Sequence, residues 1–401
     1  MKKKEMNRIS TMICALAVTM SLGCASAYTV KAENSTTAVQ TETAAEEEYF
    51  TDRDKEQNPD LTGAEKISVT DGKDITVSKE GTYVLSGSAK NVTVTVDAGK
   101  DAKVQLVLDG LTVTNTDTPV IVVENADKVF VTTASGSKNT LSVSGTFPEE
   151  EDAVIYSRDD LTLNGLGTLT IVSSDKGIDS NDDLKITGGS YDITTDGTAL
   201  KANDTIRIAD GTIDIKSGND GLHSENEEDD SLGHIYIFGG DLTIEADDDA
   251  VHAESLLVIS GGTMNITGSE GLEATNIAID NADISIQASD DGINAGKKSS
   301  AYEACITINS GTVRVAMNGY DTDAIDSNGN ITVNGGTVDI TGQSAFDCDG
   351  KAAYNGGTII VNGQTVNAIT SQQMGGGMRG GNAGNNGNFS NGSGMRTRGR
   401  F

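Results

Sequence analysis

Short alternations of apolar and polar residues run along most of the chain, and turns rich in Gly, Asn and Asp separate them. Residues 184–186, 191–193 and 213–215 are typical segments. Successive side chains of a β-strand point to opposite faces, so each alternation predicts a short strand with one buried face. We therefore expect a body built from many short strands.

A phrase of five residues recurs along the chain: an acidic or polar residue, a small residue, an apolar residue, a polar residue and a second small residue. Residues 220–224 and 291–295 are clear copies. Most steps between copies are about 22 residues long. Two longer steps predict insertions at residues 225–231 and 296–304. The central apolar positions are Ile155, Ile178, Leu200, Leu222, Val251, Leu272, Ile293, Ile325 and Phe346.

The period and the strand pattern together predict an all-β fold, a right-handed single-stranded parallel β-helix over residues 61–371. Each coil is expected to hold about 22 residues and three short strands. A leucine-rich repeat of similar length needs a helix and a Leu-rich scaffold, and neither is visible in the sequence. A β-sandwich does not hold so constant a period. Right-handedness follows from the rule for parallel crossover connections.

The ends of the chain differ from the repeats. Residues 1–27 combine a basic start with a short apolar run and predict a signal peptide. Cleavage is expected after Ala27, or before Cys24, which would then carry a lipid anchor. Residues 28–60 are predicted to be a flexible linker, and the Gly-, Asn- and Arg-rich residues 372–401 a disordered tail. The protein is expected to be secreted or held on the cell surface.

The composition is strongly acidic, with 60 Asp and Glu against 29 Lys and Arg and a net charge of −31. Such a charge argues against nucleic acid and against an anionic membrane surface as partners. Membrane attachment is expected only through a lipid on Cys24. So much like charge repels itself in a folded chain, which favours bound cations. We expect a monomer.

The repeats predict two stacked columns of polar residues, because equivalent positions of successive coils lie about 4.8 Å apart. One column follows the central apolar residue and points outward: Asp179, Lys201, His223, His252, Glu273, Asn294, Asp326 and Asp347. The other occupies the preceding turn: Lys176, Thr198, Asp220, Asp249, Glu270, Asp291, Asp323 and Ser344.

The stacked carboxylates predict bound calcium. Carboxylates about 5 Å apart repel each other, so they either take up protons or share a cation. Oxygen ligands suit Ca²⁺, whereas the long sequence separation of His223 and His252, without Cys, argues against zinc. A solvated acidic edge without metal remains the alternative. The candidate ligands are Asp220, Asp248, Asp249, Glu270, Glu273, Asp290, Asp291, Asn294, Asp323 and Asp326.

Four other residues of the columns are candidates for contacting a ligand: Lys176, Lys201, His223 and His252. Lys201 is the candidate base if the protein is an enzyme. The simpler interpretation is that Lys201 neutralises its acidic neighbours, and that the histidines are ordinary surface residues.

The phrase at residues 182–191, the run at residues 106–113 and the repeated Asp-Gly-Ile/Leu turns resemble a known family. Over about residues 60–370 the chain is similar to the carbohydrate-binding domain-containing β-helix proteins of clostridia, which resemble pectate lyases in fold. The resemblance implies calcium ions on the helix and binding of an acidic plant polysaccharide such as polygalacturonate. It places no lyase active site on this chain.

Three functions are consistent with these features. The first is a protein that binds acidic polysaccharide through shared calcium, without catalysis. The second is a calcium-dependent polysaccharide lyase, in which Ca²⁺ acidifies the proton beside a uronate carboxylate and Lys201 removes it. The third is a passive surface adhesin. The scarcity of bases near the acidic column favours the first.

Overall fold

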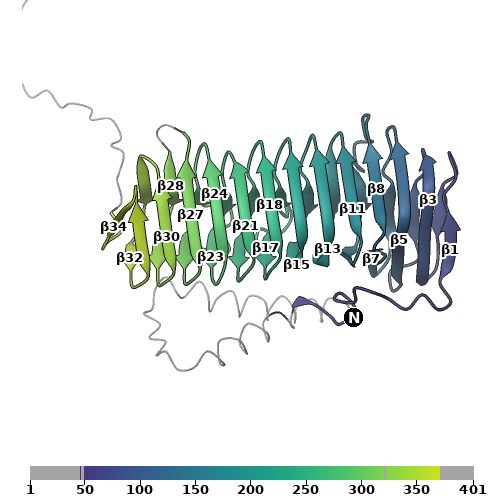
Figure 1. Ribbon diagram of the computed structural model, residues 1–401, viewed down its shortest axis with the longest axis horizontal. Coiled ribbons are helices and arrows are strands. Elements are labelled where there is room, and N and C mark those ends of the chain that lie inside the picture. The colour runs from purple at the N-terminus through teal and green to yellow at the C-terminus, as the bar shows by residue number, and fades with distance from the viewer. Residues whose placement is uncertain (1–45, 47–48, 320–321, 371–401) are drawn as a thin grey trace, which may run out of the picture.

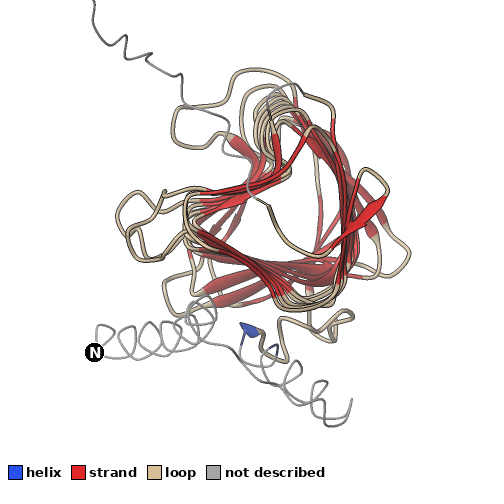
Figure 2. Ribbon diagram, turned by 90° about the vertical axis from the view of Figure 1, so that its left-hand side faces the viewer, coloured by secondary structure: helices blue, strands red, loops and turns tan. Residues whose placement is uncertain are grey.

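The computed structural model describes residues 46, 49–319 and 322–370. The predicted signal peptide, most of the predicted linker and the predicted tail at residues 372–401 lie outside this part of the chain. The described body is all-β, and only Glu46 and Tyr49 are helical within it. Parallel strands are stacked coil upon coil into a β-helix-like solenoid with a roughly triangular cross-section (Figures 1 and 2). No helix of the described residues is long and apolar enough to cross a membrane.

Three ladders form the faces of the solenoid, and the first two are joined into one sheet of 22 strands. The first face consists of the opening parts of β3 (Gly81–Lys90), β5 (Lys103–Asn115), β13 (Asp183–Thr195) and β15 (Thr205–Ser217), together with β1 (Glu65–Ser68), β7 (Lys128–Thr133), β10 (Asp160–Gly165), β17 (His234–Ile237), β20 (Leu256–Ile259), β23 (Asn276–Ile279), β26 (Cys305–Ile308), β29 (Asn330–Val333) and β32 (Ala352–Tyr354).

The second face consists of the closing parts of β3, β5, β13 and β15, together with β8 (Lys138–Val143), β11 (Thr168–Ser173), β18 (Asp241–Ala246), β21 (Thr263–Gly268), β24 (Asp283–Ala288), β27 (Thr312–Met317), β30 (Thr337–Thr341), β33 (Thr358–Val361) and β34 (Gln364–Val366), the last antiparallel to β33.

The third face is a separate sheet of 12 strands. It consists of β2 (Ile75–Val77), β4 (Val94–Asp97), β6 (Ile121–Asn125), β9 (Ala153–Ser157), β12 (Lys176–Ser180), β14 (Leu200–Ala202), β16 (Leu222–Ser224), β19 (Val251–Ala253), β22 (Leu272–Ala274), β25 (Ile293–Ala295), β28 (Asp323–Ser327) and β31 (Ser344–Cys348).

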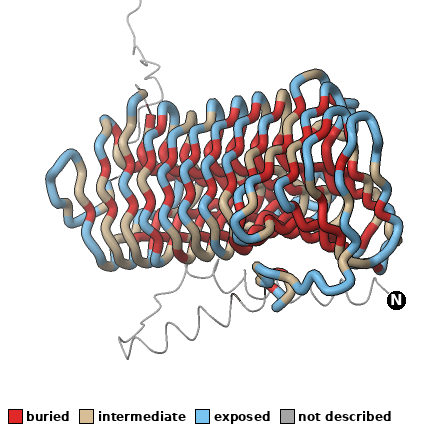
Figure 3. Tube along the Cα trace, turned by 45° about the vertical axis from the view of Figure 1, so that its right-hand side comes forward, coloured by how far each residue is buried: buried red, intermediate tan, exposed pale blue. Residues whose placement is uncertain are grey.

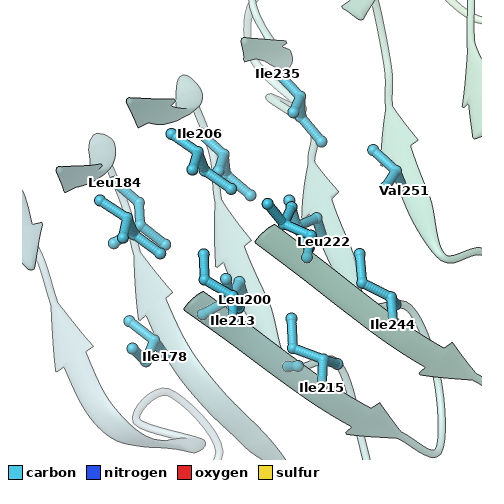
Figure 4. Packing of buried hydrophobic residues seen from close by; sticks show 14 of the residues in the cluster. Ile178, Leu184, Leu200, Ile206, Ile213, Ile215, Leu222, Ile235, Ile244 and Val251 are labelled. Atoms are coloured by element: carbon cyan, nitrogen blue, oxygen red, sulfur yellow. The ribbon is translucent and has the colours of Figure 1, made fainter. Parts of the chain in front are cut away.

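The predicted apolar column is confirmed as the inner row of the third face. Ile178 pairs with Leu200, and Leu200 pairs with Leu222. The whole series from Ile155 to Phe346 is in register. These side chains stack in the interior, where they meet apolar residues of the other two faces (Figure 4). Burial of one such side chain stabilises the fold by about 1.5–3 kcal/mol.

Burial alternates along each coil, as the strand pattern predicts (Figure 3). The expectation of three short strands per coil holds only for part of the body, however. In β13 and β15 the strands of the first and second faces run on as one bent strand. Gly189 (φ 101°) and Gly211 (φ 133°) stand at these bends, where the backbone adopts angles that residues with a Cβ rarely take.

Both predicted insertions lie between a strand of the third face and the next strand of the first face. Residues 225–231 and 296–304 form loops without strand pairing. The loops meet, because Ser299 Oγ donates to the carbonyl of Asp230 at 2.5 Å and the Ser300 amide donates to its Oδ2 at 3.1 Å. The strands on either side of each loop pair as though the insertion were absent.

Candidate functional site

The outward polar column predicted from the repeats is confirmed in full. Strand pairing aligns Asp179 with Lys201, Lys201 with His223, and His223 with His252. The alignment continues through Glu273, Asn294, Asp326 and Asp347. The preceding turns stack as well. Strand pairing aligns Lys176 and Ser344 with neighbouring coils, and the other turn residues each accept a backbone hydrogen bond from the neighbouring coil: Thr198, Asp220, Asp249, Glu270, Asp291 and Asp323. The two columns, one running from Asp179 to Asp347 and the other from Lys176 to Ser344, therefore form one strip on the outer surface of the third face. We call this strip the acidic ladder.

Two histidines stand side by side in the ladder. The rings of His223 and His252 are stacked with centroids 4.6 Å apart. His223 Nδ1 lies 2.5 Å from Asp220 Oδ2, and the two histidines and Asp220 can direct ligand atoms to one point. Their sequence separation therefore does not keep the two histidines apart, and the preference for calcium over zinc stays a prediction. The separation arises from the looped-out insertion at residues 225–231, which leaves the register unchanged.

A second group lies one coil further on. His252 Nδ1 is 2.9 Å from Asp249 Oδ2 and 3.1 Å from Glu273 Oε2, and these three side chains can also direct ligand atoms to one point. Burial disfavours the charged imidazole, but the hydrogen bond to Asp249 and the charges of Glu273 and Asp249 together outweigh burial and raise the pKa of His252. The protonated ring donates to carboxylates and does not ligate a metal, so protonation and metal binding compete at His252.

The following coils offer oxygen and amide groups. Asn294 Nδ2 donates to Glu270 Oε2 at 3.1 Å and to Glu273 Oε1 at 3.4 Å. Asp291 Oδ1 accepts from the backbone amide of Asp323 at 3.0 Å, and Asp326 lies beside Asn294 in the ladder. Asp248 and Asp290, also predicted ligands, are exposed at the edge of the turns. This part of the ladder has the donor set that Ca²⁺ prefers.

The protein alone does not neutralise this part of the ladder. Burial, together with the charges of Glu273 and Asp249, raises the pKa of Glu270 to about 8. Burial and the charges of Asp291 and Asp323 raise the pKa of Asp326 to about 6. Glu270 therefore keeps its proton near neutral pH, and Asp326 keeps its proton in mildly acidic solution, unless a cation takes the place of the proton. A divalent cation would therefore compete with protons for these oxygens.

The cations of the predicted site lie at different places. Lys176 contacts Asp152 at 2.7 Å and Asp179 at 3.1 Å, at the start of the ladder. Lys201 forms no ion pair within 4.0 Å in the part of the chain that the structure describes. Neutralisation of the acidic neighbours by Lys201 stays a prediction, which no ion pair of the described residues supports.

Sequence reasoning missed Lys298, which the second insertion brings onto the ladder. Its Nζ lies 2.8 Å from Glu273 Oε2. Burial opposes its charge, but the hydrogen bond and attraction to Glu273 prevail and raise the pKa of Lys298. The Lys297-Lys298 pair inside an otherwise polar insertion was the available signal. The insertion also borders an open cavity of about 530 Å³, with Tyr302, Asn328 and Asn330 in its lining.

Comparison with known proteins finds a family model that matches residues 71–342 and is described as carbohydrate-binding domain-containing protein. A protein of that description from Acetivibrio thermocellus is 39% identical over 224 residues, which span 54% of this chain and 77% of that protein. A solved structure titled as a polysaccharide lyase-like protein from C. thermocellum, in a gadolinium derivative, is 31% identical. It covers 55% of this chain and 93% of its own, with a TM-score of 0.45.

Proposed function

Since the chain belongs to the carbohydrate-binding domain-containing protein family, we propose that it binds an acidic polysaccharide on the acidic ladder, through calcium, and without catalysis. The observation that carries this proposal is the register of the ladder, which stacks carboxylates on consecutive coils. A polyanionic protein holds a polyanionic ligand only if cations lie between them.

The oxygen-rich half of the ladder is the proposed calcium site. Glu270, Asp291, Asn294, Asp323 and Asp326 would hold the ion. Bound Ca²⁺ supplies positive charge with coordination positions left for oxygens of a second molecule. The raised pKa values of Glu270 and Asp326 support a cation here, because burial and the neighbouring carboxylates both disfavour their ionised forms when no cation is bound.

The ligand proposed is a uronate polymer of the pectin or polygalacturonate type. Its regularly spaced carboxylates match a protein surface whose own carboxylates repeat at about 4.8 Å. His223, at one end of the oxygen-rich half, and Lys298, on its flank, supply donors for sugar hydroxyls and carboxylates. Lys176 and Lys201 extend this potential contact surface toward the N-terminal coils.

Several further properties belong to the same proposal. We infer a right-handed coil of about 22 residues per turn, from the preference of parallel crossovers. Export through the signal peptide at residues 1–27 would place the protein outside the cell, free or anchored by a lipid on Cys24. The tail and the monomeric state are proposed as the sequence predicts them, whereas residues 49–57 of the predicted flexible linker pack on the body, so the linker prediction is wrong for this part.

A pull-down on immobilised polygalacturonate tests the function. The protein is expected to be retained in millimolar Ca²⁺ and to lose most of that retention in chelator, while a neutral polysaccharide retains it in neither condition. Retention that is unaffected by chelator would contradict calcium bridging. Retention of the neutral polymer would contradict the acidic ligand, and absence of retention would favour a passive adhesin.

Lys298 is a candidate base for the alternative function as a lyase, because its amine lies beside the proposed metal ligands. A lyase base must be partly deprotonated near the working pH. Glu273 favours the charged form of Lys298, which is the reverse of what a base needs. The same amine in its charged form is suited to bind a uronate carboxylate, so the geometry favours binding over catalysis.

A further inference from the structure

A short segment ahead of the solenoid packs on the outside of the first face (Figure 3). Residues 49–57, here named the strap, belong to the stretch that the sequence assigns to the linker. Within the strap Phe50 is 4% exposed and Asp54 is fully buried. The strap contacts side chains of β7, β10 and β13, more than a hundred residues away for the last two.

Three basic side chains gather under the strap, and two of them already have acidic partners on the same face: Lys128 lies 3.7 Å from Asp160, and Arg207 lies 2.6 Å from Asp183. Outward-pointing Thr162, Lys185 and Arg207 follow one another in register on β10, β13 and β15. Lys128 projects from β7 beside them. Lys128, Lys185 and Arg207 are all buried residues, so their charges depend on partners in the protein.

A carboxylate from the strap lies at the centre of this cluster. Asp54 Oδ1 is 3.2 Å from Lys128 Nζ and accepts from Thr162 Oγ1 at 3.1 Å. Asp54 Oδ2 is 3.8 Å from Lys185 Nζ. Burial would raise the pKa of Asp54, but the two lysines prevail and lower it to about 2. The set of two ammonium groups and a hydroxyl is one that recognises a carboxylate.

Asp54 leaves part of the cluster unsatisfied. Arg207 Nε is buried and has no hydrogen-bond partner in the described part of the chain. Burial and the charges of Arg207 and Lys128 lower the pKa of Lys185 to about 8 even with Asp54 in place. With Asp160 beside Lys128 and Asp183 beside Arg207, Asp54 supplies the carboxylate within 4.0 Å of Lys185 in the described part of the chain.

Aromatic rings line both sides of the cluster. Phe130 lies next to Thr162 in register, and the Arg53 guanidinium of the strap covers its ring at 4.5 Å. Tyr236 follows Arg207 in register, and Tyr49 of the strap packs on it at 4.8 Å between ring centroids. Rings on either side of a carboxylate-binding centre suit a sugar, which has apolar ring faces and polar edges.

We propose that the outer surface of the first face is a second, metal-independent binding site for a uronate-containing oligosaccharide, and that Asp54 of the strap occupies it in place of the uronate carboxylate. The ligand binds by displacing the strap. This site lies on another face from the acidic ladder and uses cationic side chains instead of a metal. It rests on the proposed function only for the uronate nature of the ligand.

The test uses the full exported chain with chelator present, so that the acidic ladder does not contribute. Binding of a short oligogalacturonate is measured by calorimetry for wild type, Asp54→Ala and the matched control Asp52→Ala, whose carboxylate is exposed. Asp54→Ala is expected to bind at least ten-fold more tightly than wild type, and Asp52→Ala to equal wild type. Adding Lys185→Ala to Asp54→Ala should abolish the gain.

A second measurement needs no variant that could misfold. Arg53 and Lys55 flank Asp54 and are trypsin sites inside the strap. Oligogalacturonate is expected to accelerate cleavage at these sites in the wild-type chain several-fold, whereas a neutral oligosaccharide leaves the rate unchanged.

Three outcomes would overturn the proposal. Equal binding by wild type and Asp54→Ala would make the strap a structural clamp, as would cleavage that oligogalacturonate does not accelerate. Equal binding of an acidic peptide would make the cluster a general anion site. None of these outcomes bears on calcium-dependent retention, so failure of this site and failure of the proposed function are distinguishable.

Discussion

Replacing Glu270 by Gln separates the two roles that the acidic ladder gives to this side chain. Without metal, Glu270 is a half-buried carboxyl beside Glu273, and its pKa is raised to about 8. A folded-state pKa above the unfolded value contributes stability that is fully present below the ordinary pKa of 4.5 and is lost as pH rises toward 8. Gln keeps the shape and the acceptor for Asn294 but carries no charge.

The size of the effect follows from the shift. One pKa unit corresponds to about 1.4 kcal/mol, so at neutral pH the native state loses about 3 kcal/mol relative to an ordinary Glu. Glu270 is partly exposed, and solvent screening makes this an upper bound. Glu270→Gln is therefore expected to raise the melting temperature in chelator by up to about 5 °C at neutral pH, and to have little effect near pH 5.

Calorimetric melts in chelator and in millimolar Ca²⁺ test both roles. The variant should melt above wild type in chelator but gain less from calcium, because a ligand oxygen with negative charge is lost. Glu245→Gln, an exposed position on the second face, is the matched control and should change neither value. A Glu270→Gln variant that behaves like Glu245→Gln in both conditions would refute the account of the ladder as a strained, cation-seeking surface.

Three further predictions address the ladder and its ligand. Calcium at a hundred-fold excess over its Kd should stabilise wild type by about 2.7 kcal/mol, and a midpoint that responds to neither calcium nor chelator would favour a solvated acidic edge. Asp249→Asn and Asp291→Asn should each weaken calcium binding in titration calorimetry, whereas Asp214→Asn, exposed on another face, should not. Equal calcium affinities of all three variants would exclude the acidic ladder as the calcium site. Long incubation with polygalacturonate should yield no unsaturated product by absorbance, and product that disappears in Lys298→Ala or Lys201→Ala would establish a lyase.

The repeated part of the protein could be predicted from the sequence almost residue by residue. In a solenoid each coil contacts only its neighbours, so contacts follow the period of the sequence. Aligning Ile178, Leu200 and Leu222 by their phrase therefore gave the inner row and, with it, the outward polar column. The carboxylates of the acidic ladder were predicted for the same reason.

The departures from the repeat were decided by tertiary structure. The insertion at residues 225–231 made His223 and His252 seem distant, although the ladder closes over it and stacks their rings. The insertion at residues 296–304 returns Lys298 to Glu273, a contact that no spacing encodes. Both loops lie outside the period, so their positions depend on how they pack on the finished coils.

The strap is the strongest example of what only the tertiary structure decided. Its composition indicates a spacer, since the sequence shows Asp54 among charged residues with no period. Lys128 and Lys185 come together only because β7 and β13 stand two coils apart on one face with β10 between them. The sequence by itself determined the repeating contacts between equivalent residues, whereas contacts between unlike segments required the assembled surface, because burial and charge complementarity there arise only after the coils have stacked.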